Sequence, residues 1–330
     1  MQPPHRIVVL GSNSFSGASF TAAALAAGAE VVGISRSEPP DPALLPYTWA
    51  DHARFRFERL DLNEDLDRIA AVITGYRPHA IVNFAAQSMV APSWNQPLHW
   101  YRTNVVALVG LVERLRHLEG LRGFVQVSTP EVYGDTAGTI DETAPLRPST
   151  PYAVSKAAAD MHLLACRRAW GFPALFTRAA NVCGPGQPLY RILPRTIVSI
   201  LTGRRLRLEG GGRSVRSFVD ARDVAAATLA LARRGAPGGV YHLGTGLAES
   251  IRELVARVCT RLNARFEDVV EEAPGRLAQD PAYLLDCARA RADLGWSPRP
   301  LAETIDDTIA WLEARRDRLA TLPLDYVHKP

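Results

Sequence analysis

The sequence has 330 residues, of which 47% are hydrophobic and 22% charged, a composition that excludes disordered and fibrous proteins. Its net charge of +4 is spread without runs of like charge, which argues against nucleic acid and is compatible with an anionic ligand. The four cysteines form no paired motif and no apolar run is long enough for a leader or a membrane span, so we expect a cytoplasmic protein without metal.

Short β-branched runs alternate with alanine- and leucine-rich stretches along the first 180 residues. The predicted strands are 7–10, 30–34, 55–60, 80–84, 124–128 and 174–178. The predicted helices are 16–27, 66–75, 98–118 and 152–170. This alternation predicts an α/β fold with a Rossmann-type doubly wound parallel sheet.

The stretch GSNSFSG, residues 11–17, follows the first predicted strand and opens the first helix. At such a turn, exposed amide groups and the helix dipole attract a pyrophosphate, although Ser14 stands where the usual pattern has a glycine. Ser35 and Arg36 end the second strand, where NAD-selective folds usually have an acidic residue. Because arginine suits a 2′-phosphate, we expect NADP as the cofactor, with NAD possible.

The strand–helix pattern loosens after the Gly-Pro-Gly stretch at residues 184–186, which predicts a smaller C-terminal substrate-binding lobe. A late strand at 240–243 and a helix at 250–262 are predicted there. We assign residues 1–180 to a dinucleotide-binding domain to which 215–245 returns. The substrate-binding lobe is assigned to 181–214 and 246–330.

Tyr152 and Lys156, in PYAVSK, lie four residues apart on a predicted helix and therefore on one face. A nearby ammonium favours the phenolate of a tyrosine, which can then take a hydroxyl proton while hydride leaves the same carbon. Such a pair is also common on helix surfaces. This one follows STPEVYG, residues 128–134, at the carboxyl end of a predicted strand, where open α/β sheets bind ligands.

Several segments occur in a characteristic order over most of the chain. They are GSNSFSG, DLNEDL from Asp61, NFAAQS from Asn83, TN at Thr103, STPEVYG, PYAVSK, RAANVCGPGQ from Arg178, VRSFVDARDVA from Val215, and LGW from Leu294. In these segments the sequence resembles the extended short-chain dehydrogenase/reductase family, specifically its nucleotide-sugar 4,6-dehydratases of the GDP-mannose and dTDP-glucose types. The resemblance implies conversion of an NDP-hexose to an NDP-4-keto-6-deoxyhexose with recycled NAD(P), by a homodimer or tetramer.

The resemblance also implies roles for matching residues. Thr129 would hydrogen-bond the reacting sugar oxygen, Tyr152 would be the base at C4, Glu131 the base at C5, and Lys156 would hold the nicotinamide ribose. The cofactor-binding residues would be Gly11, Asn13, Ser14, Phe15, Ser16, Gly17, Ser35, Arg36, Asp61, Leu62, Ala85, Ala86, Gln87, Asn104 and Ser128, with Tyr152 and Lys156. The nucleotide-sugar-binding residues would be Ser88, Met89, Trp94, Asn181, Arg191, Arg216 and Arg276.

Pro130 is the main departure from the dTDP-glucose type, which commonly has an aspartate there as the acid for the departing hydroxyl. Proline cannot donate a proton, so the duty is expected to pass to Glu131 or to a water that it positions. Pro130 also lacks an N–H for the sheet and favours an extended Thr129. In addition, Pro281 and Ala282 replace a pair of arginines, for which Arg276 could compensate.

Four other functions fit parts of the same pattern. An NDP-sugar 5,6-dehydratase would stop at an enol ether, and a UDP-glucuronate decarboxylase would need a cation for the C6 carboxylate. A 4-epimerase has no use for Glu131. A silent dinucleotide-binding regulator tends to lose the tyrosine or the lysine, and here both are present.

Overall fold

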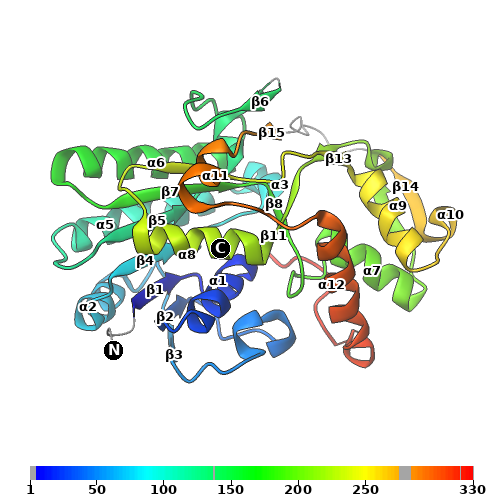
Figure 1. Cartoon of the computed structure of the whole chain (residues 1–330), viewed down its shortest axis with the longest axis horizontal. Coiled ribbons are helices and arrows are strands. Elements are labelled where there is room, and N and C mark those ends of the chain that lie inside the picture. Colours follow the sequence, from blue (N-terminus) through cyan, green and yellow to red (C-terminus); the bar gives the residue numbers. More distant parts are fainter. Residues whose placement is uncertain (1–4, 137, 275–283, 320, 330) are drawn as a thin grey trace.

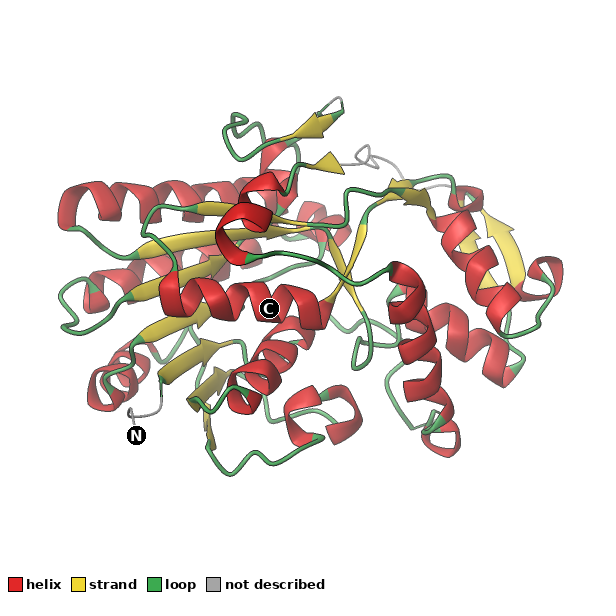
Figure 2. Ribbon diagram, in the orientation of Figure 1, coloured by secondary structure: helices red, strands yellow, loops and turns green. Residues whose placement is uncertain are grey.

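The computed structural model describes residues 5–136, 138–274, 284–319 and 321–329. Its centre is a seven-stranded sheet in the order β12-β7-β5-β4-β1-β2-β3, with every neighbouring pair parallel, which confirms the predicted α/β class (Figures 1 and 2). The strands are β1 (Arg6–Leu10), β2 (Glu30–Ser35), β3 (Phe55–Arg59), β4 (Ala80–Asn83), β5 (Gly123–Val127), β7 (Ala174–Ala179) and β12 (Val240–Leu243).

Helices cover both faces of this sheet, and the strand sequences show why. Successive side chains of a strand point to opposite faces, and in β1 Ile7 and Val9 join one apolar cluster while Val8 and Leu10 join the other. The first cluster is closed by α1 (Phe15–Ala26), α8 (Ala221–Arg234) and α11 (Ala288–Leu294). The second is closed by α2 (Leu66–Tyr76), α5 (Leu108–Leu115) and α6 (Pro151–Trp170).

The predicted helix 98–118 is not continuous. It consists of α4 (Pro97–Tyr101), a π-helical segment (Arg102–Ala107) and α5, and it is preceded by α3 (Val90–Asn95). A π-helical turn shifts the register of the side chains that follow it and often occurs at functional sites. Apolar periodicity does not reveal such a turn, because the apolar pattern continues through it.

The second lobe lies on the right of the sheet in Figure 1 and has its own apolar core. Its helices are α7 (Ile192–Thr202), α9 (Ile251–Arg261), α10 (Phe266–Val269) and α12 (Leu301–Glu313). Outside the seven-stranded sheet there are four short strand pairs, of which the β9–β14 pair packs on α9 in the second lobe. The pairs are β8 (Asn181–Cys183) with β11 (Phe218–Asp220), β10 (Val215–Arg216) with β13 (Glu249–Ser250), β9 (Leu206–Glu209) with β14 (Val270–Ala273), and β6 (Thr139–Ile140) with β15 (Leu284–Leu285). Within the described ranges, no helix has the length and apolarity needed to cross a membrane.

Candidate active site

The glycine turn between β1 and α1 is built from backbone contacts that leave no room for side chains. Gly11 has a φ of +78°, and a Cβ there would lie 2.7 Å from the backbone nitrogen of Ala85. A Cβ on Gly17 would lie 2.2 Å from the Gly11 carbonyl oxygen. Ser14 is the N-cap of α1 and accepts a hydrogen bond from the Gly17 amide, so a polar cap suits this position better than a third glycine.

The predicted cofactor residues after β2 and β4 lie beside a segment that the sequence did not single out. Arg36 Nη2 and Gln87 Nε2 both donate to the carbonyl oxygen of Lys329, at 3.0 and 2.7 Å. Lys329 Nζ also donates to Ser37 Oγ at 3.0 Å, and the His328 ring stacks on Trp100 with centroids 5.2 Å apart. Residues 328–329 therefore supply an oxygen acceptor to two of the predicted cofactor-binding donors.

Asn104 fixes the loop after β4 from the π-helical segment. Its side-chain oxygen accepts from the Gln87 amide at 2.8 Å, and its nitrogen donates to the Gln87 carbonyl at 3.0 Å and to Ser155 Oγ at 2.9 Å. Both hydrogen-bonding groups of the Gln87 backbone are thus held by one buried amide. This explains the π-helical turn, which directs Asn104 at the loop.

A one-turn 3₁₀-helix, η4 (Pro130–Tyr133), carries the predicted carboxylate at the end of β5. Pro130 occupies its first position, and Thr129 is its extended N-cap with φ −149° and ψ 147°. Thr129 Oγ1 accepts from the Glu131 amide at 3.3 Å. The predicted strand end and extended threonine are both present, and the turn places Thr129 and Glu131 on one short loop.

Tyr152 lies on the first turn of α6, whose start is specified by Thr150 as N-cap and by Pro151. Its side chain is buried, and burial raises its pKa well above the ordinary value, with a further rise from the Glu131 charge. A hydrogen bond with Thr129 and the charge of Arg191 act in the opposite direction. The structure therefore brings Thr129, Glu131 and Tyr152 together, with Arg191 reaching them electrostatically from the second lobe.

Lys156 lies one turn further along the same face of α6 and is buried. Its ammonium donates to the Val127 carbonyl oxygen at 2.7 Å, at the end of β5. Burial lowers its pKa to about 8, while the carboxylate of Asp160 acts to raise it. The positive charge of Lys156 is consequently lost only above about pH 8.

The other predicted substrate residues lie at different depths. Ser88 and Trp94 are exposed around α3, Met89 is the N-cap of α3, and α3 docks on the active-site helix because Ser93 Oγ accepts from the Tyr152 amide at 3.2 Å. In the second lobe, Asn181 is exposed on β8, and Arg216 is on β10 opposite Glu249. Arg276, with Pro281 and Ala282, lies outside the described residues.

Sequence reasoning missed a group of polar side chains behind the catalytic turn. Asp160, Arg178, Tyr133 and His242, which we call the buried network, are joined by hydrogen bonds and have exposed fractions of 0 to 3%. Two of them belong to segments that carried the resemblance, STPEVYG and RAANVCGPGQ, but a single sequence gives no sign that they meet.

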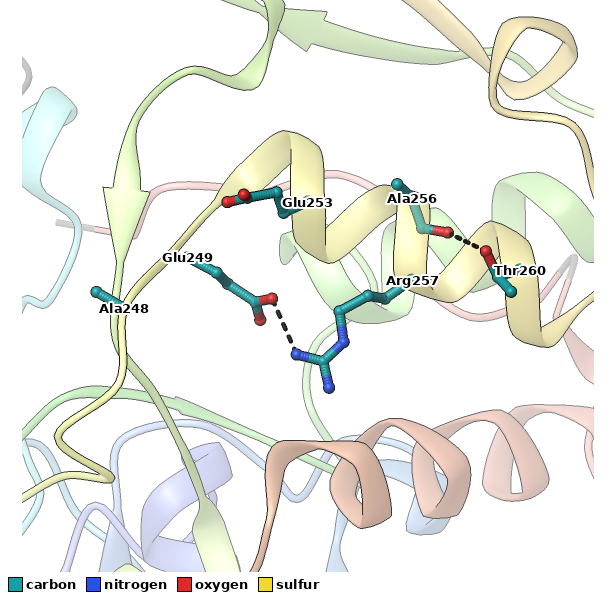
Figure 3. A pocket seen from close by; sticks show the side chains of 6 residues that line it. All are labelled: Ala248, Glu249, Glu253, Ala256, Arg257 and Thr260. Atoms are coloured by element: carbon teal, nitrogen blue, oxygen red, sulfur yellow. Dashed lines mark hydrogen bonds and ion pairs between the residues drawn. The ribbon is translucent and has the colours of Figure 1, made fainter.

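A pocket of about 460 Å³ lies in the second lobe along α9 (Figure 3). Its lining includes Glu249 and Arg257, which form an ion pair at 3.0 Å, and contains no predicted site residue. We place the chemistry at the strand ends instead, because the carboxylate, phenol and ammonium that were predicted to be catalytic converge there.

The residues at the strand ends fit a bound dinucleotide. The glycine turn brings the backbone close to the start of α1, whose first amide groups have no partner within the helix. Donors from Arg36 and Gln87 already converge on one oxygen atom. Glycine turn, helix start and convergent donors together match what a pyrophosphate and its riboses require.

Comparisons with known proteins agree with this chemistry. A family model described as GDP-mannose 4,6 dehydratase matches residues 8–308. A dTDP-glucose 4,6-dehydratase of Neisseria gonorrhoeae is 33% identical over 79% of this chain and 82% of its own, and one of Streptomyces niveus is 32% identical over 94% of each. The crystal structure of a dTDP-glucose 4,6-dehydratase from Streptomyces venezuelae with NAD bound superposes with a TM-score of 0.87 at 31% identity, covering 96% of this chain and all of that one.

Proposed function

The chain belongs to the GDP-mannose 4,6-dehydratase family, and from this premise we propose how its own residues perform 4,6-dehydration of a nucleotide-diphosphate hexose. The chain is an NDP-sugar 4,6-dehydratase of the extended short-chain dehydrogenase/reductase type. One observation most directly supports separate roles for Thr129, Glu131 and Tyr152. Glu131 and Thr129, on one turn, act in opposite directions on the pKa of the same buried phenol, Tyr152.

The first step is deprotonation of the C4 hydroxyl by Tyr152. Thr129, already hydrogen-bonded to the phenol, orients the reacting oxygen, and Lys156 supplies a positive charge one helix turn away. A dinucleotide held at the glycine turn would supply the hydride acceptor for C4 and the hydride donor for C6. The 4-keto group that results makes the neighbouring C5 proton acidic.

The second step is loss of water across C5 and C6, in which Glu131 removes the C5 proton. The departing C6 hydroxyl takes a proton from Glu131 or from a water held by it, because Pro130 has none to give. The C5 position is reprotonated after hydride returns to C6. Overall, one water leaves and no external reductant is consumed.

Incubation of the purified protein with GDP-, UDP-, dTDP- and CDP-hexoses, and with UDP-glucuronate, tests this function. Product masses distinguish the outcomes: loss of water supports dehydration, whereas loss of carbon dioxide from a uronate indicates decarboxylation. An unchanged mass with inverted C4 indicates epimerisation. Proton NMR of the product separates a 6-deoxy methyl group from a 5,6-ene.

For the cofactor, we propose that NADP binds more tightly than NAD, although the solved relative from Streptomyces venezuelae holds NAD. Arg36 follows β2, and the Lys329 ammonium donates a hydrogen bond to Oγ of the neighbouring Ser37. A 2′-phosphate would replace the Lys329 carbonyl as the acceptor of Arg36, with a stronger, charge-assisted hydrogen bond.

Arg36→Asp is expected to weaken NADP binding by about 10- to 100-fold, which is the loss of one hydrogen bond to a charged group. NAD binding should fall much less, because it has no 2′-phosphate. Fluorescence titration with each dinucleotide measures both. Arg265→Asp, an exposed charge reversal in the second lobe, is the matched control, and equal losses for the two dinucleotides would disprove the NADP preference.

We propose further that the protein is a homodimer or tetramer. Leu98, Val106 and Met161 are exposed on α4, the π-helical segment and α6, which pack against one another, and we propose that these side chains belong to one apolar face. Such a face is typical of a surface between subunits. Light scattering measures the oligomeric state, and a monomer at micromolar concentration would contradict the proposal.

A further inference from the structure

The buried network runs behind the catalytic groups from α6 to β12. Asp160 Oδ2 accepts from Ser128 Oγ at 2.7 Å and from Arg178 Nη2 at 2.9 Å. Arg178 Nη1 donates to the Tyr133 hydroxyl at 2.5 Å, with the guanidinium carbon 4.8 Å from the tyrosine ring centroid. The Tyr133 hydroxyl lies 2.6 Å from His242 Nε2.

The chemistry of these groups fixes the direction of each hydrogen bond. Arg178 has donors only, so the Tyr133 oxygen accepts from it and its own proton is directed at His242 Nε2. The His242 proton is then on Nδ1, which lies 3.2 Å from the Asp286 carbonyl oxygen. Burial lowers the pKa of His242, in agreement with a neutral ring.

Stability alone is a poor reason for this arrangement. A buried Asp–Arg pair often contributes little to folding, because the cost of removing two charges from water offsets their attraction. However, two members of the buried network, Asp160 and Tyr133, which we call its two ends, lie next to proposed catalytic groups. Asp160 is one helix turn after Lys156, and Tyr133 is two residues after Glu131 on the same one-turn helix.

We propose that Asp160, Arg178, Tyr133 and His242 are positioning residues that hold the Lys156 face of α6 and the Glu131 turn in one fixed arrangement. This inference rests on the proposed roles of Lys156 and Glu131. Asp160 serves the oxidation step through Lys156, and Tyr133 serves the elimination step through the turn. The shared guanidinium of Arg178 couples the two, because it bonds both.

Direct titration of Lys156 tests the first end. The sequence contains only two lysines, Lys156 and Lys329, so protein labelled with ¹³C-lysine gives two ε-methylene signals. Asp160→Asn is expected to lower the pKa of Lys156 from about 8 by about one unit or more, because an opposite charge nearby is lost. Lys329 is the internal reference, and Asp220→Asn, which breaks the ion pair between a buried aspartate and Arg222 at the start of α8, is the matched control.

Tyr133→Phe tests the second end by removing a single hydroxyl. We expect C5-proton exchange with deuterated solvent to slow by about tenfold, while C4 oxidation and the Lys156 titration stay as in the wild type. Tyr241→Phe is the matched control, because Tyr241 precedes His242 on β12 and its hydroxyl donates to Asp293 at 3.0 Å. Tyr133→Phe still tests the proposal if Asp160→Asn does not fold.

The outcomes separate the inference from the proposed function. An unchanged Lys156 titration in folded Asp160→Asn, or unchanged C5 exchange in Tyr133→Phe, would overturn the network. The lysine titration needs neither substrate nor cofactor. If Asp160→Asn shifts the pKa of Lys156 but the protein converts no nucleotide sugar, the proposed function is contradicted. The proposed role of Asp160 is then still supported.

Discussion

Glu131→Gln is expected to abolish formation of the 6-deoxy product while leaving oxidation at C4 in place. Glutamine keeps the shape of the side chain but cannot take the C5 proton, and the loss of a general base typically costs about 10²–10⁴ in rate. Because the Glu131 charge raises the pKa of Tyr152, its removal should also let oxidation begin at lower pH. In a single turnover, reduced nicotinamide should accumulate while the mass of the sugar shows no loss of water.

The turn itself should survive this substitution, since Thr129 holds the backbone amide of residue 131, which glutamine keeps. Glu303→Gln, an exposed carboxylate in the first turn of α12, is the matched control and should behave as the wild type. Product formed at the normal rate by Glu131→Gln would remove Glu131 from the mechanism. Failure of oxidation as well would show that the carboxylate acts before elimination.

The sheet and the backbone geometry of the turn at Pro130 were predictable from the sequence. Each of the six strands predicted in the first 180 residues is within one residue of a β-strand at either end. Inner parallel strands are mostly apolar runs bounded by turns, whereas the edge strand β3 alternates phenylalanine with charged residues. The same holds at Pro130, where a missing N–H and a restricted preceding residue are local properties. Local chemistry therefore predicted the local geometry.

Features that depend on distant contacts were not predictable in this way. The π-helical segment carries Asn104, which bonds the Gln87 loop, and the contact of Arg36 with Lys329 joins residues 293 positions apart. Likewise, Tyr133 and His242 meet across 109 positions. Periodicity reports which face of an element is buried, but it does not report what that face meets.

Tyr152→Phe should fail at the first step, and this separates it from Glu131→Gln. The substitution removes only the hydroxyl from a buried ring, so packing is preserved while the base at C4 and its hydrogen bond with Thr129 are lost. We expect oxidation to fall by about 10²–10⁴, and with it both water loss and C5 exchange. Stopped-flow absorbance of the reduced nicotinamide should show no burst.

The pH dependence gives the second part of this test. Because burial and Glu131 raise the pKa of Tyr152, the wild-type oxidation rate should increase with pH as phenolate forms, until Lys156 loses its charge above about pH 8. Tyr152→Phe should lack the rising limb, since no group at C4 then titrates. Tyr76→Phe, which removes a buried hydroxyl that has no hydrogen-bond partner in the described structure, should retain it. A rising limb that persists in Tyr152→Phe would assign the C4 base to another residue.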